Sequence, residues 1–266
     1  MSLLYRVRGR RVCPGEVKGD TKIKAIVLAA GYATRLYPLT REYPKPLLEV
    51  KRRPILDYII NKLERVRAVD EIAVVTNSKF MAKFREWKKS LKVKKPVVLI
   101  DDLTRSNTDR LGAIGDIAFV IKKKRIRKDI LVIGGDNLFS GGLTKFVNFA
   151  LSKKPAATIG LYKLGNLKDA SNYGVAKLDG RKRVVYFEEK PAKPKSRLVA
   201  MCLYYIPAAR LKLIKEYLKT ARKADATGNY IDWLKSRMAT YGFIFQGSWY
   251  DIGDFKYLTR AKKYFA

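Results

Sequence analysis

Short, continuous apolar runs alternate with amphipathic stretches along the first 155 residues of the chain. Such runs are typical of strands buried on both faces of a parallel sheet, whereas apolar residues spaced three and four apart indicate helices. Pro54 suits the first turn of a helix and Ser78 suits an N-cap. Strands that alternate with helices predict βαβ crossovers and an α/β fold. The predicted strands are Ile23–Ala30, Ile72–Thr76, Val97–Ile100 and Ile130–Gly134, and the predicted helices are Pro54–Val66, Ser78–Ser90 and Leu111–Lys123.

The second half of the chain is richer in strands. Asp179-Gly180 favours a hairpin between two of them. We therefore expect a mixed, mostly parallel sheet with a smaller antiparallel part, within one domain whose halves are about 21–155 and about 156–266. Residues 1–20 are basic and lack periodicity, so they are expected to form a flexible extension. The predicted strands are Ala157–Lys163, Gly174–Leu178, Arg183–Phe187, Val199–Ile206 and Gly242–Gln246, and the predicted helices are Pro207–Thr220, Asn229–Ala239 and Asp254–Tyr264.

Composition narrows the class of protein. The chain has 266 residues, 47% of them hydrophobic, which is enough for a core of one large domain. No run approaches the roughly 20 apolar residues of a membrane span, and residues 1–20 lack the apolar centre of a signal peptide. The two cysteines, Cys13 and Cys202, are expected to be unpaired thiols, and no CxxC pair indicates zinc. A cytoplasmic protein is the default expectation.

The charge balance is strongly basic, with 57 Lys and Arg against 24 Asp and Glu and a net charge of +33. A nucleic-acid-binding protein would concentrate this charge on one face together with aromatic residues. Here the charge is spread along the chain, and the densest runs, 88–95 and 122–128, resemble the ends of surface helices. We expect incidental polyanion binding at low salt, and dedicated nucleic-acid binding is disfavoured.

Histidine is absent, which restricts the available chemistry. Ser-His-Asp and Cys-His catalysis, histidine metal ligands and imidazole acid–base steps are all excluded. Carboxylates, lysine, arginine and bound metal remain. Phosphoryl and nucleotidyl transfer can proceed with these groups, because it depends on positioning and charge neutralisation.

The segment Leu28–Pro46 carries the strongest chemical signal. It follows the first predicted buried strand and begins with small residues, which allow a ligand to approach the backbone closely. Arg35 and Lys45 then supply positive charge. An ordinary βα loop with two solvated cations is the alternative reading of these features. The whole string, LAAGYATRLYPLTREYPKP, is more specific than its parts.

This string resembles the pattern A-A-G-x-G-T-R-L-x-P-L-T-x-x-x-P-K-P of the sugar-1-phosphate nucleotidyltransferases, which include glucose-1-phosphate thymidylyl- and uridylyltransferases. One element departs, because Ala33 stands where the pattern has its second glycine, and a methyl group there disfavours a positive φ. The resemblance implies a Rossmann-like three-layer fold with a nucleotide-binding first half and a sugar-binding second half. It covers roughly residues 22–262. The implied nucleotide-binding residues are Leu28, Ala29, Ala30, Gly31, Thr34, Arg35 and Gly112.

Two aspartates match the family's metal ligands. Asp136 lies in the string LVIGGDN and Asp251 lies in WYDIGD, both of which resemble family motifs. The resemblance implies that both carboxylates bind one Mg²⁺, an ion that takes one or two protein carboxylates and completes its shell with water and phosphates. On the residues alone, Asp136 could instead belong to an Asx turn, and Asp251 could cap the last helix, a role that Asp254 could equally fill.

Further matches concern the sugar and the base. Glu189 and Lys190 lie in a string that resembles the family's E-E-K-P, and Gly174 lies in one that resembles Y-G-V. The resemblance implies that Glu189 accepts hydrogen bonds from sugar hydroxyls, that Lys190 neutralises the sugar phosphate, and that the backbone of Gly174 lies against the sugar. Cys202 replaces a common glycine, so a narrower sugar pocket is expected. The match is weakest over 101–116, the region that reads the base, where either Gly112 or Gly115 is expected to allow close approach of the base.

The implied reaction is attack of a sugar-phosphate oxygen on the α-phosphorus of a nucleoside triphosphate, with release of pyrophosphate. Arg35, Lys45, Asp136, Lys190 and Asp251 are the implied catalytic residues. Glucose 1-phosphate with dTTP or UTP is favoured, and mannose 1-phosphate with GTP is an alternative. A catalytically inactive regulatory or polyanion-binding module on the same fold is another. Assembly into a homo-oligomer stays open, no membrane partner is expected, and no acyltransferase-type repeat domain is expected after the last helix.

Overall fold

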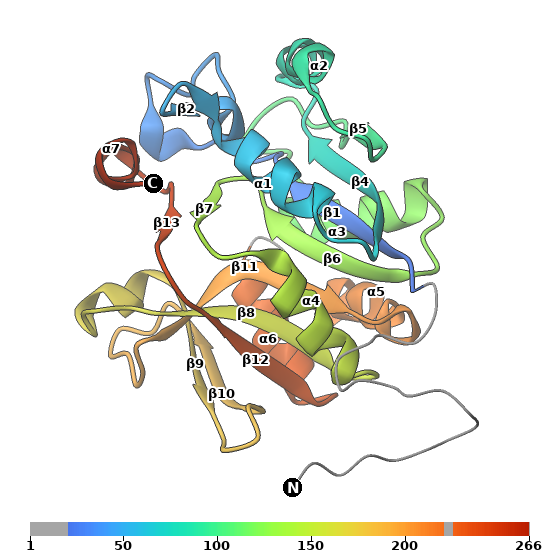
Figure 1. Cartoon of the computed structure of the whole chain (residues 1–266), viewed down its shortest axis with the longest axis vertical. Helices are drawn as coiled ribbons and strands as arrows, with labels where there is room; N and C mark the ends of the chain where they lie inside the picture. Colours follow the sequence, from blue (N-terminus) through green and yellow to red (C-terminus); the bar gives the residue numbers. More distant parts are fainter. Residues whose placement is uncertain (1–20, 221–225, 266) are drawn as a thin grey trace, which may run out of the picture.

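The computed structural model describes residues 21–220 and 226–265, so the predicted extension over 1–20 and Cys13 lie outside the described residues. A nine-stranded mixed sheet forms the centre of the molecule (Figure 1). Its main strand order is β10-β9-β11-β6-β1-β4-β5, with β8 paired to β11 and β12 paired to β8. The strands of this sheet are β1 (Ile23–Leu28), β4 (Val69–Thr76), β5 (Val97–Asp101), β6 (Asp129–Gly134), β8 (Ala157–Lys163), β9 (Gly174–Leu178), β10 (Val184–Glu189), β11 (Leu198–Ile206) and β12 (Thr240–Phe245).

Strands β6, β1, β4 and β5 are parallel neighbours, whereas β11 runs antiparallel to β6, β8 and β9. The mixed sheet and its smaller antiparallel part are therefore as predicted. β9 and β10 form the expected hairpin, in which the Asp179 carboxylate accepts hydrogen bonds from the backbone N–H groups of Arg181 and Arg183. Two short pairs lie off the sheet: β2 (Glu49–Val50) with β3 (Arg53–Pro54), and β7 (Asn137–Phe139) with β13 (Trp249–Asp251).

Helices cover both faces of the sheet and make three layers. The alternation of buried side chains along β1 explains this arrangement, because Ala25 and Val27 pack on one layer and Ile26 packs on the other. In Figure 1, α1 and α4 lie in front of the sheet, and α3, α5 and α6 lie behind it. The helices are α1 (Ile55–Glu64), α2 (Met81–Ser90), α3 (Gly112–Lys123), α4 (Leu143–Ser152), α5 (Lys212–Thr220), α6 (Thr227–Lys235) and α7 (Phe255–Tyr264).

Several predicted helix starts are wrong. Ser78 does not cap α2, because its hydroxyl donates to Asp101 and the helix begins three residues later. Asn229 lies inside α6, which begins at Thr227. Asp251 and Asp254 are the two candidates for the cap of the last helix, and Asp254 fills this role. Its carboxylate accepts a hydrogen bond of 3.0 Å from the backbone N–H of Tyr257. Within the described ranges, 21–220 and 226–265, no helix is long and apolar enough to cross a membrane.

Helix α7 and the short β7/β13 pair hold the long loop after β1 in place. The apolar face of α7 packs on a small separate core that includes Leu36 and Leu48 from this loop and Ile252 after β13. The C-terminal end of the described chain therefore positions the segment that carries the strongest sequence signal. The ends of β1, β6 and β13 meet next to this small core, and the candidate site is built there.

Candidate active site

The loop after β1 is pinned by backbone hydrogen bonds. The carbonyl of Leu28 accepts from the N–H of Gly135 at 2.8 Å, and the fully buried Asn77 donates from its side chain to the carbonyl of Ala30 at 2.8 Å. Ala33 adopts φ 49°, ψ 43°, the left-handed conformation that its methyl group disfavours. The loop therefore makes the turn that a glycine would make, and the carbonyl of Ala33 is fixed by the Thr40 hydroxyl at 2.8 Å.

The end of β6 lies close against the end of β1. A Cβ atom added at Gly135 would be only 2.7 Å from the carbonyl oxygen of Leu28, so this approach requires glycine. The next residue, Asp136, forms an ion pair with Lys45 from the loop, with 2.5 Å between Nζ and Oδ2. The two side chains are 27% and 16% exposed, respectively, so the pair is partly shielded from water. Burial alone would lower the pKa of Lys45, but attraction by Asp136 and then Asp251 raises it overall.

Pairing of β7 with β13 brings the second aspartate to the first. Asp251 lies opposite Asn137, the residue that follows Asp136. Asn137 secures this pair, because its side-chain oxygen accepts from Trp249 Nε1 at 2.7 Å and its side-chain nitrogen donates to the carbonyl of Met201 at 2.6 Å. Burial and the nearby Asp136 raise the pKa of Asp251 to about 6, against the effects of Lys45 and Lys190. Two carboxylates from distant parts of the sequence thus share one site.

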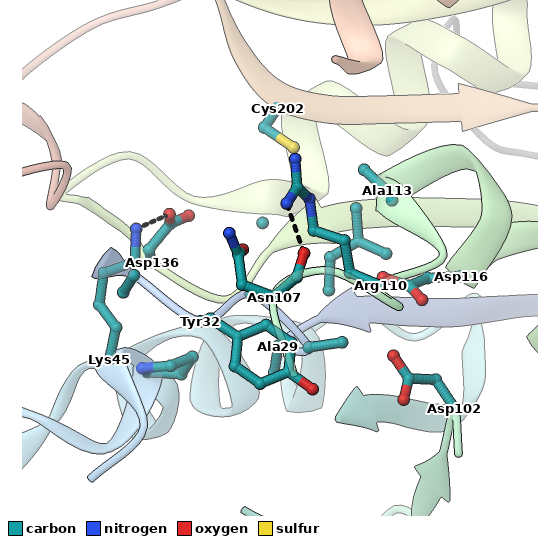
Figure 2. Close-up of a pocket in the computed structure, with 17 residues that line it drawn as sticks. Ala29, Tyr32, Lys45, Asp102, Asn107, Arg110, Ala113, Asp116, Asp136 and Cys202 are labelled. Atoms are coloured by element: carbon teal, nitrogen blue, oxygen red, sulfur yellow. Dashed lines mark hydrogen bonds and ion pairs between the residues drawn. The ribbon is translucent and has the colours of Figure 1, made fainter. Parts of the chain in front are cut away.

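A cavity of about 300 Å³ opens beside the Lys45–Asp136 pair. The loop residues Leu28, Ala29, Ala30 and Gly31 line it, and so does Gly112, whose φ of 74° marks the start of α3. Figure 2 shows Lys45 and Asp136 at one end, Asp102 and Asp116 at the opposite end, and Arg110 between them.

Not every predicted nucleotide-binding residue reaches this cavity. Thr34 and Arg35 are exposed on a short 3-10 helix, Thr34–Leu36, and neither lines it. The sequence analysis also missed lining residues that the fold supplies. Asp116 is four residues after Gly112 in α3 and therefore lies on the same helical face, a spacing that the sequence already contained. The missed lining residues are Tyr32, Ala33, Pro46, Asp102, Asn107, Arg110, Ala113, Asp116 and Gly134.

The predicted sugar-binding residues form a second group outside this cavity. The carboxylate of Glu189 is wedged between two glycines. A Cβ atom at Gly174 would be 2.9 Å from its Oε2, and one at Gly228 would overlap that oxygen. Burial raises the pKa of Glu189, while the neighbouring Lys190 opposes this. Lys190 adopts φ 47°, and its positive charge opposes the rise in the pKa of Asp251.

Cys202 lines the cavity close to the aspartate pair. Burial and the charges of Asp136 and Asp251 raise the pKa of its thiol to about 12, so the sulfur stays protonated and is a poor nucleophile. Its backbone has φ 49°, where β11 shifts register against β8 between Ala200 and Tyr204. The side chain adds bulk to this cavity, which the predicted sugar-binding residues do not line, and it adds no reactivity; the narrower sugar pocket stays a prediction.

Comparison with known proteins identifies the family of this chain. The family model described as "Nucleotidyl transferase" matches residues 24–266. The bifunctional protein GlmU of Methanococcus aeolicus is 29% identical over 229 residues, which are 86% of this chain and 51% of that protein. A putative mannose-1-phosphate guanyltransferase of Sulfolobus acidocaldarius is 30% identical over 87% of this chain and 60% of its own length. The chain thus spans about half the length of the first of these relatives.

The fold is shared with a solved structure. The crystal structure of a putative glucose-1-phosphate thymidylyltransferase from Bacillus anthracis superposes with a TM-score of 0.74, covering 91% of this chain and 94% of that one. The sequence identity in this superposition is 23%, so the likeness concerns the fold alone.

Proposed function

The chain belongs to the nucleotidyl transferase family, and on that premise we propose that it makes a nucleoside diphosphate sugar and pyrophosphate from a nucleoside triphosphate and a sugar 1-phosphate. A phosphate oxygen of the sugar phosphate bonds to the α-phosphorus, the bond from that phosphorus to the bridging α–β oxygen breaks, and pyrophosphate leaves with the electron pair. The observation that carries the proposal is the Lys45–Asp136 pair, which lies beside both Asp251 and the cavity formed by the loop 28–33.

The main barrier to this reaction is electrostatic, because two polyanions must come together. Lys45 lies at one end of the cavity, Lys190 lies near Asp251, and Arg35 lies on the same loop as Lys45. We assign to these three cations the neutralisation of phosphate charge. A phosphate monoester carries close to two negative charges at pH 7, so the attacking oxygen needs no general base. This agrees with the absence of histidine and with a protonated Cys202.

The donor set fits a divalent cation. Asp136 and Asp251 are two partly buried carboxylates whose charges affect each other, and Mg²⁺ binds through one or two carboxylates plus substrate phosphates. Within 21–220 and 226–265 there is no cluster of three or more His, Cys, Asp or Glu side chains, so substrate and water would complete the shell. We propose that Asp136 and Asp251 hold Mg²⁺, which would supply charge neutralisation at the reacting phosphates.

Glu189 suits recognition of a sugar. Its carboxylate is held between Gly174 and Gly228, and no described residue donates a hydrogen bond to it. Buried carboxylates normally have donors, and sugar hydroxyl groups would supply them. Gly174 has no side chain to separate its backbone from the Glu189 carboxylate, so the two lie in close contact. Glucose 1-phosphate is the first sugar phosphate to test. We also propose that the reaction takes place in the cytoplasm, where nucleoside triphosphates are made.

The test is pyrophosphate release with Mg²⁺, measured for five nucleoside triphosphates against several sugar 1-phosphates. At least one pair should turn over. Asp251→Asn should lower that rate about 10²–10³-fold, because one ligand of the Mg²⁺ that neutralises the reacting phosphates is lost. Asp179→Asn in the exposed β9–β10 turn is the matched control and should keep full activity. The proposal fails if the folded, unchanged protein releases pyrophosphate with no combination of nucleoside triphosphate and sugar 1-phosphate. That result would support the alternative of a catalytically inactive module.

A further inference from the structure

Two buried aspartates close the end of the cavity that is opposite to Lys45 and Asp136 (Figure 2). Asp102 directly follows β5 and is 3% exposed, and Asp116 lies in the second turn of α3 and is 6% exposed. Both line the cavity, so their burial does not separate them from a ligand bound there. Fully buried carboxylates are costly, and their presence in a ligand cavity therefore calls for a chemical reason.

The position of Asp102 is fixed by its neighbours. Its Oδ1 accepts hydrogen bonds of 2.8 Å from both the backbone N–H and the hydroxyl of Thr104. That hydroxyl lies 3.1 Å from the hydroxyl of Tyr32, whose ring packs at 6.2 Å from the ring of Phe80. Burial raises the pKa of Asp102, while its bonds to Thr104 and its contact with Asp116 oppose that shift. Asp102 is thus held in place by Thr104 and is in contact with Asp116.

The charges at the two ends of the cavity orient a nucleotide. With a divalent cation held by Asp136 and Asp251, the end with Lys45 would carry net positive charge and attract a triphosphate, whereas Asp102 and Asp116 repel it. The base therefore lies at the aspartate end. An ionised carboxylate is a hydrogen-bond acceptor only, and two neighbouring carboxyl groups keep at least one negative charge at neutral pH. The base that binds best will be the one whose edge presents adjacent donors.

Guanine is the common base that meets this requirement. Its N1–H and N2 amino group are neighbouring donors, which one carboxylate can accept together, as in bidentate pairing. Uracil and thymine place carbonyl oxygens on both sides of N3–H, and adenine and cytosine place an acceptor nitrogen beside the amino group. We propose that Asp102 and Asp116 select guanine, so that GTP is the nucleotide substrate. This inference rests on the proposed function, and it favours GTP over the dTTP or UTP expected from the family resemblance.

The first experiment measures nucleotide binding and turnover separately. Affinities of the Mg²⁺ complexes of GTP, ITP, dTTP, UTP, CTP and ATP are determined by calorimetry without sugar phosphate, and pyrophosphate release is then measured with sugar 1-phosphates. GTP should bind best. ITP, which lacks the N2 amino group, should bind about 10–100-fold more weakly, which corresponds to the loss of one good base contact. Tightest binding and turnover with dTTP or UTP would overturn the inference and leave nucleotidyl transfer intact. Preferential GTP binding without any turnover would uphold the inference and overturn the proposed function.

Two variants test the residues themselves. Asp102→Asn and Asp116→Asn each replace a carboxylate by an amide, and the amide oxygen in the Asp102→Asn variant can still accept from Thr104, so folding should persist. At least one of them should lose the preference for GTP over ITP and bind XTP about 10-fold or more better than the unchanged protein, because an amide N–H₂ can donate to the C2 carbonyl of xanthine. Asp101→Asn is the control, since Asp101 bonds Ser78 and does not line the cavity. If both variants keep the original GTP:ITP ratio, the inference is wrong.

Discussion

Replacing Gly228 by alanine tests whether the sugar side of the site depends on the position of Glu189. Gly228 lies in the first turn of α6, and the added Cβ would overlap Oε2 of Glu189 and lie 2.6 Å from its Cδ. The carboxylate must therefore move. Such overpacking costs about 1–3 kcal/mol, of which alanine in a helix returns up to about 1 kcal/mol relative to glycine. We expect a net loss of up to about 2 kcal/mol in the free energy of unfolding, measured by urea denaturation.

The functional effect should be larger than the effect on stability. If sugar hydroxyl groups donate to Glu189, displacing its carboxylate removes charged hydrogen bonds worth about 1.5–3 kcal/mol. We expect the KM for the sugar 1-phosphate to rise about 10–100-fold, while the KM for the nucleoside triphosphate changes little. Steady-state pyrophosphate release with each substrate varied in turn separates the two constants.

A control and a double mutant make this result decisive. At Gly180, in the β9–β10 turn, an added Cβ meets nothing within 4 Å, so Gly180→Ala should leave both stability and KM unchanged. In Gly228→Ala/Glu189→Ala the overlap is gone, so the double mutant should lose less stability than the two single changes together. The reasoning is refuted if the cost of Gly228→Ala is the same with and without Glu189, or if its KM for sugar phosphate is normal.

Three further predictions concern charge and backbone strain. Asp136→Asn or Arg35→Ala should leave the fold intact and lower pyrophosphate release about 10²–10³-fold. Near-normal turnover in either variant would remove the site assignment. In the unchanged protein, EDTA should abolish pyrophosphate release until Mg²⁺ is restored. Burial alone would raise the pKa of Asp129, but hydrogen bonds led by that from Lys154 at 2.8 Å lower it overall. The ionised Asp129 therefore stabilises the fold above its unfolded pKa of about 4, and this stabilisation is lost as pH falls through its lower folded pKa. In Asp129→Asn, the free energy of unfolding should fall less steeply as the pH is lowered through this range. Ala33→Gly removes the strain of a left-handed alanine, about 1–2 kcal/mol, but glycine also raises the entropy of the unfolded chain, which costs about 0.4–1 kcal/mol. Urea denaturation should therefore show a net gain of about 0.5–1 kcal/mol in the free energy of unfolding.

Local sequence determined those features that depend on a few consecutive residues. The apolar run that became β1 is buried on both faces, and its short, continuous apolar character sufficed to identify it. The hairpin at Asp179-Gly180 formed because the turn residues satisfy their own backbone. Caps were less reliable, since Ser78 had a competing partner, Asp101, from a different strand. A side chain that can bond locally does so only when no better partner is brought to it by the fold.

The family motifs indicated the residues of the site, but only the fold showed which of them meet. Asp136 and Asp251 come together through the three-residue strands β7 and β13, which are too short to predict from a pattern. Arg35, by contrast, belongs to the strongest motif and still lies outside the cavity. Motif spacing records which residues occur together, whereas contact depends on strand pairing between segments that are far apart in the sequence.

By itself, then, the sequence determined the α/β class and restricted the chemistry available without histidine, because short-range periodicity and composition carry that information. The resemblance of one motif to a family pattern indicated which loop to propose as the phosphate-binding loop. Tertiary structure alone decided that Ala33 adopts a left-handed conformation, that Gly228 confines Glu189, and that Asp102 and Asp116 form one buried pair at the end of the cavity opposite to Lys45. The physical reason is that charge, burial and close packing act between neighbours in space, and those neighbours are chosen by sheet topology.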